Sequence, residues 1–227
     1  MTGSPAVPYS PAVPYVVPFA VFIALIGLGL ILPMPALADQ VLRLAVMAVV
    51  LYFVARPALD FHVKEWSGSL LIGVAIFVLW IAPDLLSPSY RHSFLFDNAL
   101  MGAARSSMPE AARHDVPVLW LRSLRAVLVV PIIEELFWRG WLMRWLIEPN
   151  FQRVPLGAYS AGSFWVVALM FASEHGAYWD VGLAAGIIFN WWMIRTKSLG
   201  DLMLAHAVAN ACLSAYVVAA GKWEYWL

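Results

Sequence analysis

Residues 117–147, PVLWLRSLRAVLVVPIIEELFWRGWLMRWLI, form a largely apolar stretch that is long enough to cross a membrane as a helix. About 20 apolar residues span the hydrocarbon core of a bilayer, yet this stretch keeps Glu134, Glu135 and Arg139 near its middle. A charge at the bilayer centre costs about 2.5–3.5 kcal/mol on insertion scales, so such residues mark functional sites by default. We therefore expect this helix to carry the chemistry of the protein.

The chain as a whole has the composition of a membrane protein. Of its 227 residues, 63% are hydrophobic and 12% are charged, whereas soluble domains have about 45–50% apolar and about 25% charged residues. This composition excludes a soluble globular fold. The formal net charge is zero, which provides no basic field for binding nucleic acid. The single cysteine, Cys212, excludes an internal disulfide framework and a CxxC zinc or redox site.

Further apolar runs predict an all-α fold, a polytopic bundle of about seven transmembrane helices. Besides 117–147, the expected spans are 15–32, 41–59, 68–86, 158–179, 181–196 and 199–220. The polar stretch 87–115 separates the third span from the fourth, and we expect it to form a loop or a surface helix.

The same pattern divides the chain into four parts: 1–14, 15–116, 117–220 and 221–227. The first is a Pro-rich lead-in, because its four prolines disfavour a helix. The second contains the N-terminal transmembrane helices and the polar loop. The third is the membrane core that contains the charged span, and the fourth is a C-terminal tail.

The loops indicate how the chain sits in its membrane. If the N-terminus is inside, the inner loops contain slightly more Lys and Arg than the outer loops. This excess favours an inside N-terminus. Ala36-Leu37-Ala38 has the form of a signal-peptidase site. However, no Lys or Arg precedes the first apolar run, and the run is longer than a signal-peptide core. We expect a retained first span and a multi-pass protein of a cell membrane, inner or plasma.

The charges of span 117–147 face different directions if the span is helical. Glu135 and Arg139 are four residues apart and share a face in the order that favours an ion pair. Glu134 points about 100° away, where it is free to face a cavity. Pro131 removes a backbone hydrogen bond and favours a kink that opens such a cavity. The alternative is a helix that ends at the membrane surface, with these charges in water.

Two later spans repeat this arrangement of polar residues at helical spacing. Phe171 and His175 share one face of span 158–179, and His206 and Asn210 share one face of span 199–220. Alanines surround the second pair, which allows neighbouring helices to approach closely.

The remaining polar residues within the spans have simpler interpretations. Asn190 is expected to form a hydrogen bond between helices. Glu174 and Asp180 lie near the expected interface, where water solvates them. Cys212 is two residues beyond Asn210 and faces away from it.

Together these side chains provide the groups that a hydrolase needs. A glutamate with a histidine can remove a proton from water as a general base. A second histidine with an asparagine can donate hydrogen bonds to the oxyanion that forms when water attacks a carbonyl. The sequence contains no Walker loop, HExxH or serine triad pattern. Hydrolysis by an activated water is the predicted chemistry, and the alternative is a non-catalytic membrane protein that binds a peptide, lipid or partner through the same cluster.

The three motifs, in this order on separate helices, resemble those of the CAAX protease and bacteriocin-processing family, also called Abi. This family includes the type II CAAX prenyl endopeptidases. The motifs read Glu134-Glu135…Arg139, Phe171…His175 and His206…Asn210. The resemblance covers about residues 117–215, and the small size is similar to that of the exosortase-associated members.

The resemblance implies an intramembrane endopeptidase whose site consists of Glu134, Glu135, Arg139, His175, His206 and Asn210. By position, Glu134 and His175 would activate the water, His206 and Asn210 would hold the oxyanion, and the other two would support the first motif. The implied partners are the lipid bilayer and a membrane-anchored protein or peptide substrate, prenylated or not.

The sequence leaves the use of a metal open. Glu134, His175 and His206 could supply a zinc site of two histidines and one carboxylate. However, no two of them share a helix at the spacing of metal ligands. We favour a reaction without a cofactor, with a divalent metal such as zinc as the alternative.

One geometric condition must be met for this site to assemble. Glu134, His206 and Asn210 fall near the centres of their spans, whereas His175 lies about seven residues past the centre of 158–179. Seven residues of α-helix rise about 10 Å. A tilt, a kink at Pro131 or a later start of the fifth span must bring His175 level with the others.

Overall fold

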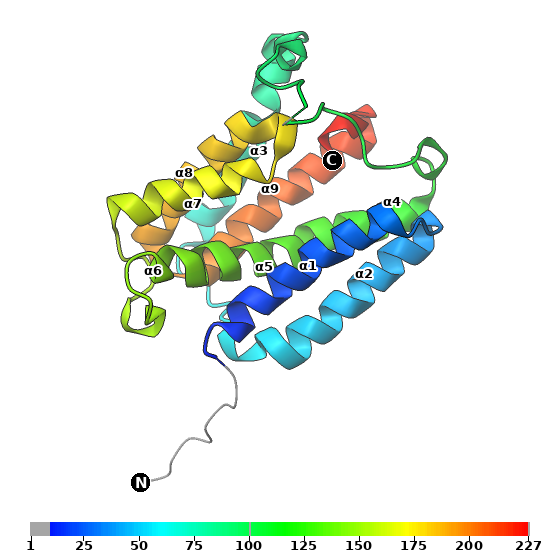
Figure 1. Ribbon diagram of the computed structural model, residues 1–227. Helices are drawn as coiled ribbons and strands as arrows, with labels where there is room; N and C mark the ends of the chain where they lie inside the picture. Colours follow the sequence, from blue (N-terminus) through cyan, green and yellow to red (C-terminus); the bar gives the residue numbers. More distant parts are fainter. Residues whose placement is uncertain (1–9, 100, 227) are drawn as a thin grey trace.

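The computed structural model describes residues 10–99 and 101–226, and within these residues it is built from helices without a β-strand (Figure 1). Most of the predicted lead-in, residues 1–9, lies outside this part. The first helix, α1, already begins at Val13, earlier than the prolines of the lead-in suggested. Pro14 lies in its first turn, where the missing N–H breaks no helical hydrogen bond.

The predicted bundle of about seven spans is confirmed. In chain order the helices are α1 (Val13–Ile31), α2 (Ala36–Val50), α3 (Trp66–Leu86), α4 (Val116–Leu124), α5 (Val130–Glu135), α6 (Met143–Trp145), α7 (Ala161–Ser173), α8 (Trp179–Thr196) and α9 (Leu199–Ala220). Five of the described helical segments are long and apolar enough to span a membrane: Val13–Ile31, Ala36–Ala58, Trp66–Leu86, Val116–Trp145 and Leu199–Ala220. α7 and α8 complete the predicted seven segments but are not among these five, and α7 is shorter than predicted.

The long fourth span, Val116–Trp145, is not a uniform α-helix. Two wide π-helical segments, Arg125–Val129 and Leu136–Leu142, separate α4 from α5 and α5 from α6. The irregularity that was expected at Pro131 therefore begins just before it. A π-helical turn holds an extra residue and often marks a functional site. In this helix, the second segment contains Arg139.

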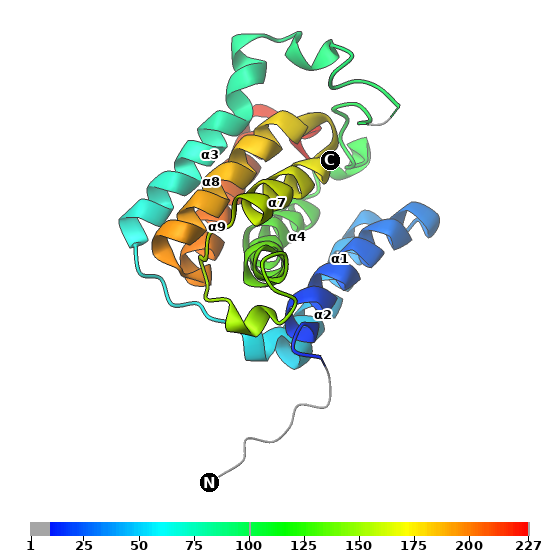
Figure 2. The same ribbon diagram turned by 60° about the vertical axis from the view of Figure 1, so that its left-hand side comes forward.

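The helices pack in pairs around this span. α3 lies along α9 and α7 along α8, while α1 and α2 pack on the other side of the fourth span (Figure 2). The small residues of α9 allow the close approach that the sequence predicted. A Cβ at Gly73 of α3 would lie 2.5 Å from the carbonyl oxygen of Ala205, so only glycine fits there.

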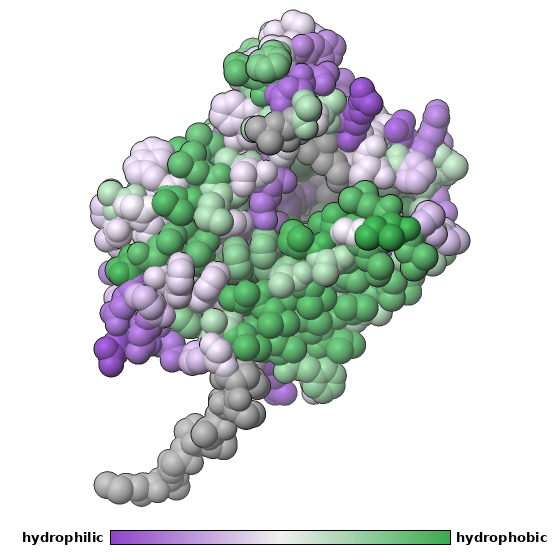
Figure 3. All heavy atoms as spheres, in the orientation of Figure 1, coloured by the Kyte–Doolittle hydropathy of each residue, from purple (hydrophilic) through white to green (hydrophobic). Residues whose placement is uncertain are grey.

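The outer surface of α1 and α2 is apolar. On the face drawn in Figure 3, hydrophobic side chains cover both helices. Leu30 and Ile31 of α1 are 85% and 83% exposed, and Val49 of α2 is 56% exposed. A continuous apolar surface of this kind is not stable in water. The chain is an integral membrane protein, and this surface faces lipid.

In its described residues, the polar stretch 87–115 is a loop with two short 3-10 turns, at Tyr90–His92 and Glu110–Ala112. It is anchored by the buried Arg91, which contacts Asp84 at 3.0 Å and Asp180 at 2.9 Å. Burial lowers the pKa of the Arg91 guanidinium, but the hydrogen bonds and charges of Asp180 and Asp84 together raise it above its usual value. The prediction that water alone solvates Asp180 is wrong, because the loop folds back over the end of the bundle.

A buried carboxylate fixes the opposite end of the bundle. Asp201, in the first turn of α9, accepts hydrogen bonds from the backbone N–H groups of Lys64 and Glu65, at 2.8 Å each. It also accepts one from the hydroxyl of Ser69 at 2.9 Å. The side chain is completely buried. These bonds connect the start of α3 to the start of α9 and set the register between the two helices.

We predict that Asp201→Ala destabilises the protein by about 2–4 kcal/mol, because it leaves several buried donors without an acceptor. Thermal unfolding in mild detergent, followed by intrinsic tryptophan fluorescence, measures the loss. Glu148→Ala is the matched control, since Glu148 forms only a long, exposed pair with Arg153 at 3.7 Å. Equal melting temperatures for the two variants would exclude Asp201 as an anchor.

Candidate active site

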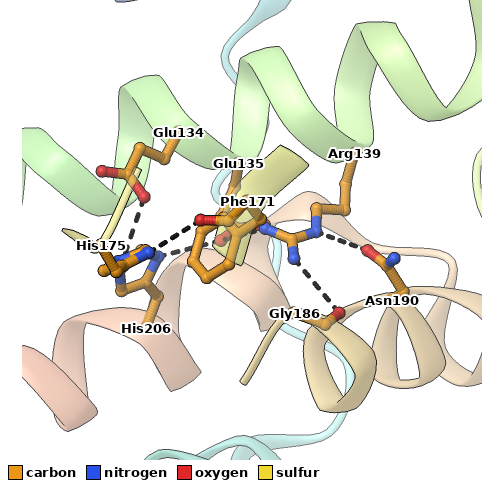
Figure 4. Close-up of polar contacts among 8 residues, drawn as sticks. All are labelled: Glu134, Glu135, Arg139, Phe171, His175, Gly186, Asn190 and His206. Carbon is orange, nitrogen blue, oxygen red and sulfur yellow. Dashed lines mark hydrogen bonds and ion pairs between the residues drawn. The ribbon is translucent and has the colours of Figure 1, made fainter. Parts of the chain in front are cut away.

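The centre of the site is an ion pair inside the bundle (Figure 4). Arg139 donates from Nη1 to both carboxylate oxygens of Glu135, at 3.2 Å each. Both side chains are completely buried. The pairing predicted from their spacing is confirmed. The alternative of a helix end with its charges in water is wrong, because these charges lie in the core.

Arg139 is held on all sides. Its Nε donates to Oδ1 of Asn190 at 2.9 Å, and its guanidinium carbon lies 4.6 Å and 5.3 Å from the ring centroids of Phe171 and Phe189. The amide of Asn190 also donates to a backbone carbonyl of α7 at 2.8 Å. Asn190 therefore forms the hydrogen bond between helices that the sequence predicted, and it fixes the guanidinium as well.

Glu135 also orients the imidazole of His206. The Nδ1 of His206 lies 2.9 Å from Oε1 of Glu135, and because the carboxylate is an acceptor, Nδ1–H is the donor. This leaves Nε2 facing Glu134, whose Oε2 is 4.0 Å away. A single carboxylate thus binds an arginine of its own helix and a histidine of α9.

Glu134 has a different environment from its neighbour. Its Oε2 is buried and has no hydrogen-bond partner in the described part of the chain. The side chain lines a cavity of about 250 Å³. Figure 3 shows a hollow with hydrophilic atoms beside the apolar face of α1 and α2. As predicted from the helical spacing, Glu135 is paired and Glu134 is left to face a cavity.

The geometric condition on His175 is met. α7 begins at Ala161, later than the expected start, and ends at Ser173, so His175 lies in the turn that follows. Its Nδ1 is 2.8 Å from the carbonyl oxygen of Phe171. A carbonyl only accepts, so Nδ1 carries the proton and Nε2 of the neutral ring is an acceptor. His175 lines the same cavity as Glu134.

Four of the six predicted site residues line this cavity: Glu134, His175, His206 and Asn210. The Nδ2 of Asn210 donates to the carbonyl oxygen of Ala126 at 2.8 Å, in the first π-helical segment. The remaining two, Glu135 and Arg139, lie behind the cavity wall. The structure therefore divides the predicted set into groups that face the cavity and groups that hold them.

The cavity has a further carboxylate that sequence reasoning assigned to solvent. Glu174 is exposed and also lines the cavity. Its position directly before His175, where α7 ends, is the feature of the sequence that could have indicated this location. Because the turn bends toward the bundle, a residue that would have faced the membrane surface reaches the site.

The residues of the zinc alternative do not form a metal site in this conformation. Within residues 10–99 and 101–226, no group of three His, Cys, Asp or Glu side chains could hold a metal ion. The Nδ1 atoms of His175 and His206 are bonded to a carbonyl and to Glu135, so Nε2 is the nitrogen of each ring that could bind a ligand.

Comparison with known proteins agrees with the three motifs. Residues 116–212, somewhat less than half of the chain, match the family described as type II CAAX prenyl endopeptidase Rce1-like. No curated protein and no solved structure matches the chain. The resemblance inferred from the motifs is confirmed over these residues, and the family supports a peptidase embedded in a membrane.

We predict that Arg139→Leu destabilises the protein by about 3–5 kcal/mol, because it removes the positive charge that compensates the buried Glu135 carboxylate. The double variant Glu135→Gln/Arg139→Leu should recover part of this loss, since it removes the unpaired charge. The melting temperatures of the wild type, the two single variants and the double variant measure the coupling between the two side chains. Strictly additive losses would contradict a direct interaction between the two side chains.

Proposed function

We propose that the chain, through its Rce1-like domain, is an intramembrane endopeptidase that hydrolyses a peptide bond of a membrane-associated protein or peptide. The observation that carries this proposal is the buried Oε2 of Glu134, which faces the cavity without a hydrogen-bond partner in the described residues. A buried carboxylate without a partner is costly, and a water molecule in the cavity would satisfy it. That water is the reactant of a hydrolysis.

In the proposed reaction, Glu134 accepts a proton from the water while the water oxygen attacks the carbonyl carbon of the substrate. Nε2 of His175 is a free acceptor on the same cavity, and it binds and orients the water. When the C–N bond breaks, Glu134 returns the proton to the leaving amine nitrogen. The proton is thus balanced over the two steps, and the products are a carboxylic acid and an amine.

The oxyanion of the intermediate is stabilised by His206 and Asn210 in this mechanism. Glu135 accepts the hydrogen bond from Nδ1–H of His206 and so fixes the direction of the ring. In the imidazolium form both nitrogens are donors, and Nε2–H then donates to the oxyanion. Asn210 uses one of its two amide hydrogens on Ala126 and has the second for the substrate. Glu135 and Arg139 act as positioning residues, because they fix His206 from behind the cavity.

We further propose that this reaction is of the glutamate type, that it needs no metal, and that it takes place in a cell membrane, inner or plasma. A glutamate that faces a water-sized space can act as a general base without a metal, and this supports the glutamate type. The substrate is membrane-anchored, with prenylated and unprenylated peptides as the two classes to compare.

We predict that Glu134→Gln lowers kcat at least about 100-fold, since the amide cannot accept the proton of the water. The measurement uses the full-length protein in detergent with a library of fluorogenic peptides, prenylated and unprenylated. Activity of the wild type should persist in chelators.

The matched control for this experiment is Glu148→Gln. It removes an exposed carboxylate that follows the same membrane span as Glu134. Full turnover in a correctly folded Glu134→Gln variant would remove Glu134 from the mechanism. Loss of wild-type activity under chelation, restored by zinc, would favour the metal alternative. Peptide binding without any cleavage would instead favour the non-catalytic alternative.

We predict that Asn210→Ala lowers kcat by about 100- to 1,000-fold with little change in KM, the effect of losing one oxyanion donor. Cys212→Ala is the control, because Cys212 is on the same helix but is not among the residues that line the cavity. If kcat falls equally in Asn210→Ala and Cys212→Ala, damage to α9 rather than loss of a hydrogen bond reduces the rate.

A further inference from the structure

His175 differs from the other cavity-facing groups of the site because it does not lie in a helix. α7 ends at Ser173 and α8 begins at Trp179, so His175 belongs to the short connection between them. Glu134 and His206, in contrast, are carried by long membrane spans. A side chain in a short turn is not fixed by a helix of its own, so contacts from other elements must set the position of the imidazole.

Those contacts come from α3 and α8, which lie side by side (Figure 2). The ring centroid of His175 is 5.1 Å from that of Trp80 on α3, in an edge-to-face arrangement. The ring also lies against Gly182 of α8, where an added Cβ would be only 3.1 Å from Nδ1. Trp80 and Gly182 thus form a slot for the imidazole, and the spacing between α3 and α8 decides whether the ring fits.

Arg91, from the loop between α3 and α4, joins the same two helices. Its guanidinium contacts Asp84 near the end of α3 at 3.0 Å and Asp180 in the first turn of α8 at 2.9 Å. Its Nη1 also donates to the carbonyl oxygen of Ala177 at 2.6 Å, two residues after His175. One buried side chain therefore holds α3, α8 and the turn that carries the histidine.

The two carboxylates that Arg91 contacts are close to the slot along each helix. Asp84 is four residues beyond Trp80 on α3, and Asp180 is two residues before Gly182 on α8. One turn of α-helix rises only about 5.4 Å. A change in the spacing between the two carboxylates therefore moves the two walls of the slot as well.

This connection requires the shape of a guanidinium. Arginine has five N–H donors in a planar fork, whereas lysine has all its donors on one atom. The guanidinium of Arg91 reaches two carboxylates and a carbonyl at once. Its central carbon also lies 4.1 Å from the ring centroid of Tyr178, which fixes the plane of the group. A lysine at this position would keep the charge but lose part of the connection.

We propose that Arg91 is a positioning residue for His175: by joining α3 to α8 it sets the width of the slot and holds Nε2 of the imidazole toward the cavity. The inference rests on the proposed function only for the role of His175, which is to bind the water. Arg91 lies outside residues 116–212 that match the family. The loop thus adds a part to the site that the matched domain does not contain.

The test labels the histidines of the full-length protein with diethylpyrocarbonate in phosphatidylcholine nanodiscs, and mass spectrometry gives a rate for each histidine. In the wild type, His175 should react at least about threefold more slowly than the exposed His62, because its ring is enclosed. Arg91→Lys should raise the rate at His175 about threefold, since the slot widens. The rate at His206 should stay the same, because Glu135 holds that ring.

The cleavage assay provides a second readout. Arg91→Lys should lower kcat about tenfold with little change in KM, since the water is misplaced while the contacts with the substrate remain. Arg105→Gln is the matched control, because Arg105 is exposed on the same loop, and it should change neither the labelling rates nor kcat. If the wild type cleaves no peptide, the proposed function fails, but the labelling rates still decide this inference.

The labelling rates can contradict the inference in three ways. Equal rates at His175 in the wild type and in Arg91→Lys overturn it. An equal rise at His175 and His206 also overturns it, because a general loosening of the bundle would then be the cause. A wild-type His175 that reacts as fast as His62 overturns it without any variant. If Arg91→Lys does not fold, Asp180→Asn weakens the connection to α8 and should give the same selective rise at His175.

Discussion

A carboxylate and a guanidinium, Glu135 and Arg139, face each other in the middle of a bundle from which water is largely excluded. Neither charge could remain there alone, since an unpaired buried charge is far more costly than a paired one. The pair therefore requires Asn190 from α8 beside the guanidinium and His206 from α9 beside the carboxylate. Three helices that are distant in the sequence are drawn together by the need to satisfy one ion pair.

This arrangement separates two adjacent glutamates into different chemical roles. Glu135 is saturated with hydrogen bonds, so it is a structural acceptor that holds an imidazole in a fixed direction. Glu134 is one residue away, but the helix turns its side chain into the cavity, where Oε2 lacks a partner in the described residues. The residues behind the cavity are held by hydrogen bonds, and they in turn fix the reactive residues that face it. Proteins commonly hold functional groups in place in this way.

The two π-helical segments contribute to this arrangement from within one helix. The first, Arg125–Val129, exposes a backbone carbonyl at Ala126 to Asn210 and turns Arg125 toward the cavity. The second contains Arg139. Local widening of a helix changes which side chains share a face. The fourth span thus presents groups from several turns to a single cavity, which a straight α-helix of the same sequence would not do.

The sequence by itself determined the membrane class, the approximate seven spans, the Glu135–Arg139 pair and the side on which Glu134 lies. These depend on composition and on neighbours within one helix, where the 3.6-residue repeat is a reliable guide. Only the tertiary structure decided that His175 reaches the level of Glu134, that Glu174 joins the cavity, and that Arg91 binds Asp180. It alone also decided that Arg125 faces inward. Each of these depends on where a helix ends, how a loop folds back or where a turn widens, and such features are set by packing between segments that are far apart in the chain.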